Sequence, residues 1–163
     1  MNDAGEIREG EVALGFDPGG RAQAGVAFIG HIRSDWARGS APRNVTQARE
    51  AGGGNARIEL DPAYAPGLAG LAVGRSIWVL YWMDRARRDL ILQSPRHHNE
   101  PRGVFTLRSP VRPNPVAMAA VTITALDPQT GVIGIDATDA FDMTPVIDIK
   151  PWMGGIDIPP AER

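Results

Sequence analysis

The sequence contains no cysteine and only three histidines in 163 residues. Without thiols, disulfide bridges, thiolate zinc sites and cysteine-based catalysis are excluded, and three histidines are too few for a histidine-rich metal cage. Long apolar runs are also missing, since the run from Ile77 to Met83 is far shorter than the roughly 20 residues that cross a bilayer. The acidic start, residues 1–11, lacks the features of a secretory signal. We therefore expect a cytoplasmic protein with no metal site and no membrane partner.

Helical periodicity is scarce, whereas turn-forming residues are abundant, with 19 glycines and 14 prolines. Apolar residues alternate with threonine from Val121 to Ala125, and the same period of two recurs from Ile133 to Asp136. Many short strands with little helix predict an all-β, mainly antiparallel fold, and a small closed β-barrel with long loops would leave no strand edge exposed. The expected strands are 24–32, 57–60, 77–83, 89–93, 104–107, 116–126, 132–137 and 145–149.

The chain length of 163 residues favours one compact domain. Residues 1–22 are acidic and glycine-rich with few apolar side chains, which predicts a flexible tail, and residues 23–163 are expected to form the barrel domain. The loop 33–55 is long for a simple connection and predicts either a ligand loop or a mobile segment. Because residues 77–83 are apolar at every position, we expect both faces of that strand to be covered, the second by a partner subunit in a homodimer.

Fourteen of the sixteen arginines lie between positions 21 and 112, although the net charge of the chain is only −2. If this stretch forms one surface, its field suits a polyanion such as RNA. The alternative is that these arginines are scattered contacts with solvent.

A proline-rich segment from Arg108 to Pro115 has three prolines in six residues. The prolines fix an irregular backbone and present Ser109 and Asn114 as rigidly held polar groups between two arginines, Arg108 and Arg112. This pattern suits recognition of a ligand's carboxylate, hydroxyls or ring edge. The alternative is a structural turn between strands. The chain has no glycine-rich phosphate loop and no nucleophile elbow.

A second polar pattern lies near the end of the chain. On a strand, Asp148 and Lys150 share a face with Val146, and their Cα atoms are about 7 Å apart. The carboxylate and the amine either form a surface ion pair or act on a substrate, where the acid could accept a proton. Our hypothesis is that Asp148 and Lys150 are catalytic residues that order the active face.

Several blocks of the sequence, in this order and spacing, are similar to the TrmO (YaeB or VirR-like) family of S-adenosylmethionine-dependent tRNA methyltransferases. The similarity extends from about Ala24 to Trp152, and the chain looks like a short form without the C-terminal domain of longer members. The blocks that carry the resemblance are 29–34 (IGHIRS), 77–83, 103–105, 108–115 (RSPVRPNP) and 144–151 (TPVIDIKP).

This resemblance implies a small dimeric β-barrel that binds S-adenosylmethionine near the subunit boundary. It also implies N-methylation of N6-threonylcarbamoyladenosine beside the anticodon of tRNA, with tRNA and a second subunit as partners and no DNA. Carried over by position, the expected cofactor-binding residues are Asn44, Asp84, Arg85, Ser109, Ala119, Ala137, Thr138, Asp139 and Ala140. Those expected to contact the RNA substrate are Arg43, Arg108, Arg112 and Asn114.

The chain departs from the family pattern at four positions. Asn44 stands where a glutamine is usual, Ser76 and Asp84 stand where histidines are usual, and Met143 replaces a glycine. Two alternatives therefore stay open. One is a regulatory module that binds S-adenosylmethionine without turnover, and the other is a methyltransferase for a small molecule.

Overall fold

The structure, a computed structural model, describes residues 6–95 and 99–160. Contacts divide the chain into two compact units. We call Ala27–Trp82 with Met118–Arg163 the barrel unit, and Met1–Val26 with Met83–Ala117 the small unit. Strands dominate both, and their sheets are antiparallel, so the predicted mainly antiparallel all-β class with little helix is confirmed. Within the described residues, no helix is long and apolar enough to span a bilayer.

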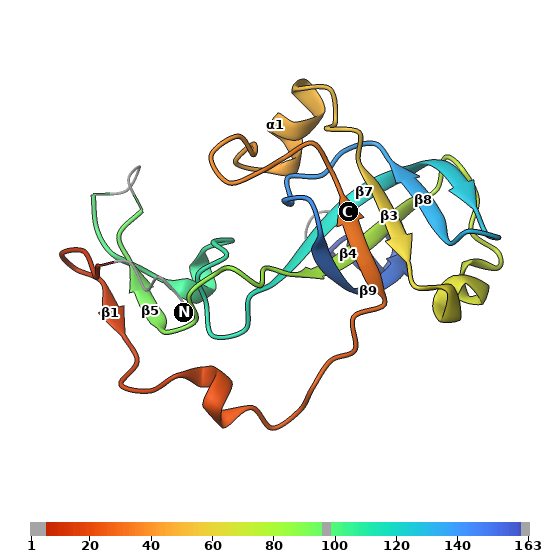
Figure 1. The fold of residues 1–163 in the computed structure, drawn as a ribbon. Coiled ribbons are helices and arrows are strands. Elements are labelled where there is room, and N and C mark those ends of the chain that lie inside the picture. Colours follow the sequence, from red (N-terminus) through yellow and green to blue (C-terminus); the bar gives the residue numbers. More distant parts are fainter. Residues whose placement is uncertain (1–5, 96–98, 161–163) are drawn as a thin grey trace. The chain divides into compact units, whose positions relative to one another are not determined.

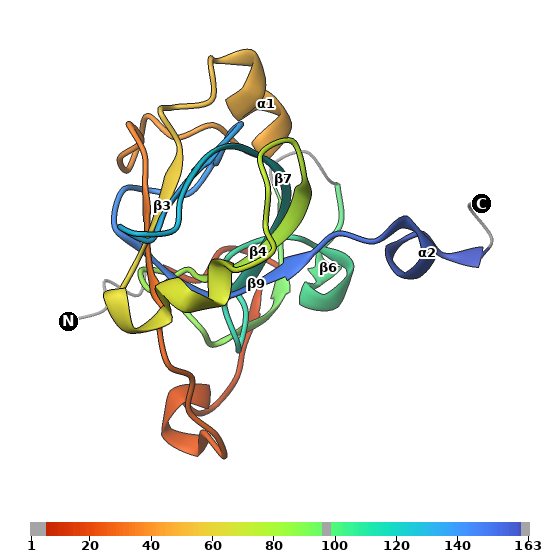
Figure 2. The same ribbon diagram turned by 90° about the vertical axis from the view of Figure 1, so that its right-hand side faces the viewer.

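Six strands of the barrel unit close into a ring with the order β2-β3-β8-β7-β4-β9. The ring closes because β9 pairs with β4 on one side and with β2 on the other (Figures 1 and 2). No strand of this sheet therefore has an open edge of the kind that invites aggregation. The strands are β2 (Gly30–Arg33), β3 (Arg57–Leu60), β4 (Ser76–Trp82), β7 (Val116–Asp127), β8 (Val132–Ile135) and β9 (Thr144–Pro151).

The interior of the ring is filled by alternate residues of these strands, as the period of two predicts. Burying each such side chain contributes roughly 1.5–3 kcal/mol. Seven interior side chains of the described ring strands are at most 1% exposed: Ile32, Ile58, Ile77, Val79, Ile123, Ile133 and Val146.

The outer face of β4 is only partly covered by its own chain. Ile77, Val79 and Tyr81 are buried, whereas the outward residues Trp78 and Leu80 are only half-buried. Coverage of the second face by another subunit stays a prediction.

A shift in register between β4 and β9 changes which residues of β9 point inward. Leu80 faces Asp148, but the next residue, Tyr81, faces Val146. The prediction that Val146 shares a face with Asp148 is therefore wrong, because Val146 is fully buried while the Asp148 side chain is 44% exposed.

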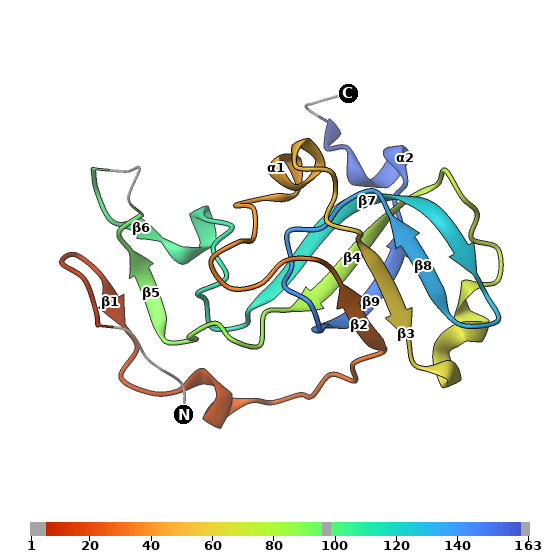
Figure 3. The ribbon, with the colours of Figure 1, turned by 45° about the horizontal axis from the view of Figure 1, so that its top comes forward.

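Two short α-helices flank the ring, α1 (Val45–Glu50) and α2 (Gly154–Asp157). The 3₁₀-helix η2 (Pro62–Leu68) follows β3. The long loop 33–55 thus contains α1, which lies beside the segment that joins β8 to β9 (Figure 3).

The small unit has a three-stranded sheet of order β1-β5-β6, formed by β1 (Val12–Ala13), β5 (Leu90–Gln93) and β6 (Arg102–Gly103). Its 3₁₀-helices are η1 (Pro18–Arg21) and η3 (Val104–Thr106). The expected strand at 104–107 is wrong, because local hydrogen bonds from Thr106 Oγ1 to Gly103 O and from Leu107 N to Val104 O close a turn there.

The segment for which the sequence predicts a flexible tail contributes to this sheet. β1 pairs with β5, and the Ser94 hydroxyl donates to the carbonyl of Glu9 at 2.8 Å. The predicted division of the chain after residue 22 stays a prediction. Flexibility of residues 1–22 stays a prediction, and residues 1–5 lie outside the described part.

Met143 has a left-handed backbone conformation with φ of 66°. Its N–H donates to the carbonyl of Ile32 at 2.9 Å, which holds the chain in this conformation at the start of β9. A residue with a Cβ atom is strained in this backbone conformation, whereas glycine adopts it without strain.

We expect Met143→Gly to raise the free energy of unfolding by about 1 kcal/mol, and Met143→Val to lower it. Urea denaturation of the three proteins measures both differences. A glycine variant less stable than the valine variant would contradict the strain at this position.

Candidate functional site

The residues expected at the site are divided between the two units. Whether the two groups form one site stays a prediction. The barrel unit contains Arg43, Asn44, Ala119, Ala137, Thr138, Asp139, Ala140, Asp148 and Lys150, and the small unit contains Asp84, Arg85, Arg108, Ser109, Arg112 and Asn114.

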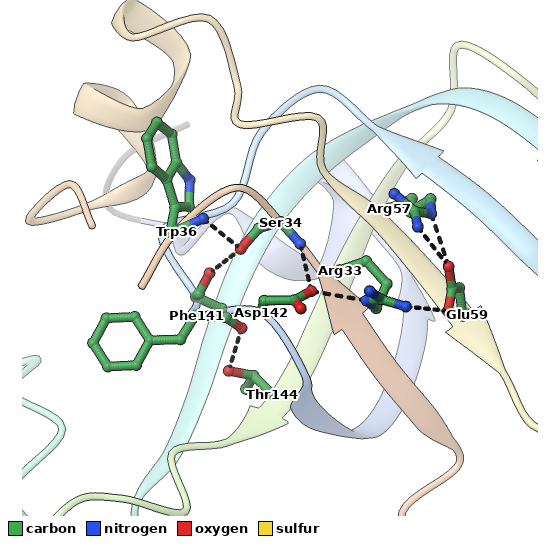
Figure 4. A network of polar contacts seen from close by, with 9 residues as sticks. Arg33, Ser34, Trp36, Arg57, Glu59, Phe141, Asp142 and Thr144 are labelled. Atoms are coloured by element: carbon green, nitrogen blue, oxygen red, sulfur yellow. Dashed lines mark hydrogen bonds and ion pairs between the residues drawn. The ribbon is translucent and has the colours of Figure 1, made fainter. Parts of the chain in front are cut away.

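The segment Ala137–Ala140, between β8 and β9, is fixed by hydrogen bonds from the loop that follows β2. The indole Nε1 of Trp36 donates to the carbonyl of Thr138 at 2.7 Å. The Ser34 hydroxyl donates to the carbonyl of Ala140 at 2.8 Å and accepts from the Trp36 amide (Figure 4). Within the segment, the Ala140 amide donates to the Thr138 hydroxyl. Ala137, Thr138 and Ala140 are buried, so the backbone here is rigid and suited to holding a ligand.

Asp139 is held from inside the barrel. The hydroxyl of Tyr81, a residue only 5% exposed, donates to Asp139 Oδ1 at 2.9 Å. Asp139 Oδ2 has no hydrogen bond to another described residue. One carboxylate oxygen is thus anchored, and the other can accept from a hydroxyl or amino group of a ligand.

Asn44 is the N-cap of α1. Its Oδ1 accepts from the Gln47 amide at 2.9 Å, while Gln47 Oε1 accepts from the Arg43 amide at 3.2 Å. This capping explains why an asparagine stands at position 44 in place of the longer glutamine, because asparagine is among the preferred N-cap residues. The NH₂ group of Asn44 has no hydrogen bond to another described residue and can donate to a ligand.

The other end of α1 is tied to the barrel. The Arg49 guanidinium binds the Asp136 carboxylate and donates to the carbonyl of Ala120 at 2.8 Å. Ala120 follows Ala119 in β7, and Ala119 is 7% exposed. Helix α1, β7 and the end of β8 therefore form one connected structure.

Two glycines allow this packing. A Cβ at Gly53 would lie 2.4 Å from the carbonyl oxygen of Asp136, and one at Gly54 would lie 2.5 Å from the Trp36 indole. Both glycines also have positive φ. Sequence reasoning missed the positioning roles of Ser34 and Trp36. The run Gly52-Gly53-Gly54 was the available signal, because close backbone approach requires glycine.

An ion-pair network braces the same end of the barrel (Figure 4). Arg33 Nε contacts Asp142 Oδ1 at 2.8 Å, and Arg33 NH1 contacts Glu59 Oε2 at 3.1 Å. Asp142 Oδ1 also accepts from the Ser34 amide. The hydrogen bond from Arg33, together with that from Ser34, holds the pKa of Asp142 below its ordinary value.

Asp148 and Lys150 form an ion pair with each other, with 2.8 Å between Oδ2 and Nζ, and both side chains are largely exposed. They lie opposite Leu80 and Trp78 on the outer face of β4, whereas Tyr81 points inward. The pair and the inward-pointing Tyr81 therefore lie on opposite faces of the paired strands β4 and β9. Their catalytic role stays a prediction, and an exposed pair contributes about 1 kcal/mol or less to stability.

In the small unit, the proline-rich segment is braced by internal hydrogen bonds. Arg112 NH1 donates to the carbonyl of Leu107 at 2.9 Å, and the Ser109 hydroxyl accepts from the Val111 amide. Arg88 donates to the carbonyl of Pro113 and to Asn114 Oδ1. Arg112 thus stabilises the loop, and its predicted contact with RNA is not tested. Asp84, Arg85 and Arg108 are exposed.

Comparisons with known proteins identify the following similarities. Residues 31–158 match the family model of the tRNA-methyltransferase O N-terminal domain. A probable S-adenosyl-L-methionine-binding protein of Archaeoglobus fulgidus is 39% identical over 130 residues, which are 79% of this chain and 34% of that protein. The probable S-adenosyl-L-methionine-binding protein VirR of Rhizobium radiobacter is 32% identical over 158 residues, which are 93% of this chain and 86% of VirR.

The solved structure of TrmO from Pseudomonas aeruginosa superimposes with a TM-score of 0.66 at 28% sequence identity. The match covers 88% of this chain and 62% of that chain. The chain thus spans about a third of the Archaeoglobus relative and less than two thirds of the solved structure.

Removing the hydroxyl that anchors Asp139 is expected to destabilise the barrel. We expect Tyr81→Phe to lower the free energy of unfolding by about 1 kcal/mol, because the half-buried hydrogen bond to Asp139 is lost. Tyr64→Phe is the control, since Tyr64 is 41% exposed. Urea denaturation compares the two, and equal effects would show that the contact with Asp139 is not stabilising.

Asp142 is expected to stabilise the fold in a pH-dependent way. Its pKa is lowered in the folded state, so its contribution is present above the ordinary value of 3.8 and is lost as the pH falls through the folded-state value. We expect Asp142→Asn to cost about 1 kcal/mol at neutral pH, and the difference from the wild type to shrink below pH 3.8. Denaturation across this pH range measures it. A difference that is constant with pH would rule out the ionic contribution.

Proposed function

Because this chain belongs to the family of the tRNA-methyltransferase O N-terminal domain, we propose that it binds S-adenosylmethionine and transfers its methyl group to a nitrogen of a modified adenosine in tRNA. The proposed acceptor is N6-threonylcarbamoyladenosine, the substrate that the sequence resemblance implies. The observation that carries the proposal is the family match across residues 31–158, which includes the braced segment Ala137–Ala140.

The side chains of the barrel unit fit the chemistry of this cofactor. Asp139 offers a carboxylate oxygen that can accept from ribose hydroxyls or from the amino group of the methionine part, and Asn44 offers an NH₂ donor for the carboxylate or the adenine ring. Negative charge at Asp139 also favours a cationic ligand. The cofactor, when bound, supplies an electrophilic methyl group.

The proposed role of the protein in this reaction is mainly positioning. Methyl transfer between two held groups gains its rate from alignment and from exclusion of water. The hydrogen bonds from Trp36 and Ser34 hold the segment Ala137–Ala140 in place before a ligand binds. Ligand binding then costs little ordering of the backbone.

Three exposed arginines of the barrel unit support an RNA substrate. Arg38, Arg43 and Arg75 are exposed and form no ion pair with another described residue. Arg33, Arg49 and Arg57, in contrast, are neutralised by carboxylates. The first three are therefore the arginines of this unit that we propose to contact RNA phosphates.

We further propose that a second copy of the chain covers the outer face of β4. Trp78 and Leu80 are only half-buried there, and Met118 at the beginning of β7 is 44% exposed. Large half-buried apolar side chains on a closed sheet are typical of a subunit interface.

A module that binds the cofactor without turnover is the second candidate. It is favoured by one observation, the ion pair that Asp148 and Lys150 form with each other on an exposed surface. Neither group is thereby held ready for proton transfer.

Titration calorimetry with S-adenosylmethionine tests the cofactor site. We expect the wild type to bind, and Asp139→Asn to bind at least about tenfold more weakly because a charge-assisted hydrogen bond is lost. Asp61→Asn is the matched control, since the Asp61 side chain makes no capping hydrogen bond. Ser109→Trp tests the small unit's predicted contribution. Absence of binding by the wild type, or equal binding by Asp139→Asn and the control, would overturn the assignment.

Methyl transfer separates the candidates. With a labelled methyl donor and tRNA from a strain that lacks the modification, we expect label in the RNA, and activity that falls steeply as salt rises. Cofactor binding without label in RNA or in any small nucleophile would favour the binding module. Label transfer to a small molecule, indifferent to salt, would instead indicate a small-molecule methyltransferase.

A further inference from the structure

The barrel unit has a hollow of about 300 Å³ whose lining does not include the segment Ala137–Ala140. This volume is at the lower end for ligand sites and suits a single ring system. All of its lining residues belong to the barrel unit. They are Arg49 of α1, Ser76 of β4, Ala120, Val121 and Thr122 of β7, and Trp152 after β9.

The backbone groups around the hollow are already paired. The Trp152 amide donates to the carbonyl of Ser76 at 3.0 Å, and the Thr122 amide donates to Asp136 Oδ1 at 2.7 Å. The side-chain hydroxyls of Ser76 and Thr122 and the indole N–H of Trp152 have no hydrogen bond to another described residue. These three groups can therefore bind the polar edge of a ligand.

The indole of Trp152 forms an aromatic wall in a restrained position. A Cβ added at Gly154 would lie 3.2 Å from Cη2 of Trp152, so the backbone of the following turn packs against the ring. Trp152 is nevertheless only half-buried. A restrained and accessible ring is suited to stacking, because little side-chain entropy is lost on binding.

One arginine lines the hollow, and a second arginine directly precedes a lining residue in the sequence. Arg49 lines the hollow and forms an ion pair with Asp136. Arg75 directly precedes Ser76, is exposed and forms no ion pair with another described residue. Aromatic stacking combined with nearby arginine is the combination that binds single-stranded nucleic acid, since each base has a stacking face and each nucleotide carries a phosphate.

We infer that this hollow binds one unpaired base of an RNA, stacked on Trp152, with Ser76 and Thr122 as hydrogen-bond partners and Arg75 close to the adjoining phosphate. The inference rests on the proposed RNA substrate and assigns to it a contact outside the cofactor site. Ser76, one of the positions at which the chain departs from the family pattern, thereby acquires a role in holding RNA.

Fluorescence anisotropy with a labelled RNA hairpin tests this inference, and the same RNA fully paired with its complement is the comparison. We expect the wild type to prefer the hairpin. Trp152→Ala should weaken hairpin binding by about tenfold, and Trp152→Phe should retain most of it, because stacking needs an aromatic face. Tyr64→Ala, which removes an exposed ring elsewhere on the barrel unit, is the control and should leave binding unchanged.

A second variant covers the case in which Trp152→Ala fails to fold. Ala120→Leu keeps every polar group and adds bulk inside the hollow, so it should also weaken hairpin binding. If the wild type binds the hairpin and both variants bind it equally well, the hollow is not an RNA subsite, while the proposed function stands. If the wild type binds neither the hairpin nor the duplex, both the RNA subsite in the hollow and the proposed RNA substrate are overturned. Binding of S-adenosylmethionine by the same samples then decides separately whether the cofactor assignment survives.

Discussion

The double pairing of β9 is the constraint on which the barrel unit depends. β9 binds β4 over most of its length and binds β2 through residues near its start, and this closes the sheet. The closed sheet buries a core of isoleucine and valine that no open sheet of these short strands would enclose. Closure also fixes the two ends of the segment that joins β8 to β9.

This geometry connects the core to the proposed chemistry. Tyr81 belongs to the buried face of β4, yet its hydroxyl reaches Asp139. The loop after β2 supplies Ser34 and Trp36, which bind the backbone on either side of Asp139. A ligand site built in this way is rigid because its supports are core residues and strand ends, and a rigid site can align two reacting groups.

The sequence predicted the features that depend on local pattern. Alternation from Val121 to Ala125 identified β7, because the side chains of a strand alternate between its faces. η3 was mistaken for a strand, because its hydrogen bonds within the turn compete with a pattern that looks extended. The exposed position of Asp148 depends on a shift in register against β4, which only the partner strand determines. Ser34 and Trp36 act on residues more than 100 positions away, a distance that no local pattern spans.

We propose that the braced segment Ala137–Ala140 holds the methyl donor. Hydrogen–deuterium exchange of the full chain, with and without S-adenosylmethionine, tests it most directly. We expect slower exchange of the amides in this segment and at the start of α1 when the cofactor is added. Cofactor binding shown by calorimetry, with protection confined to other parts of the chain, would contradict it.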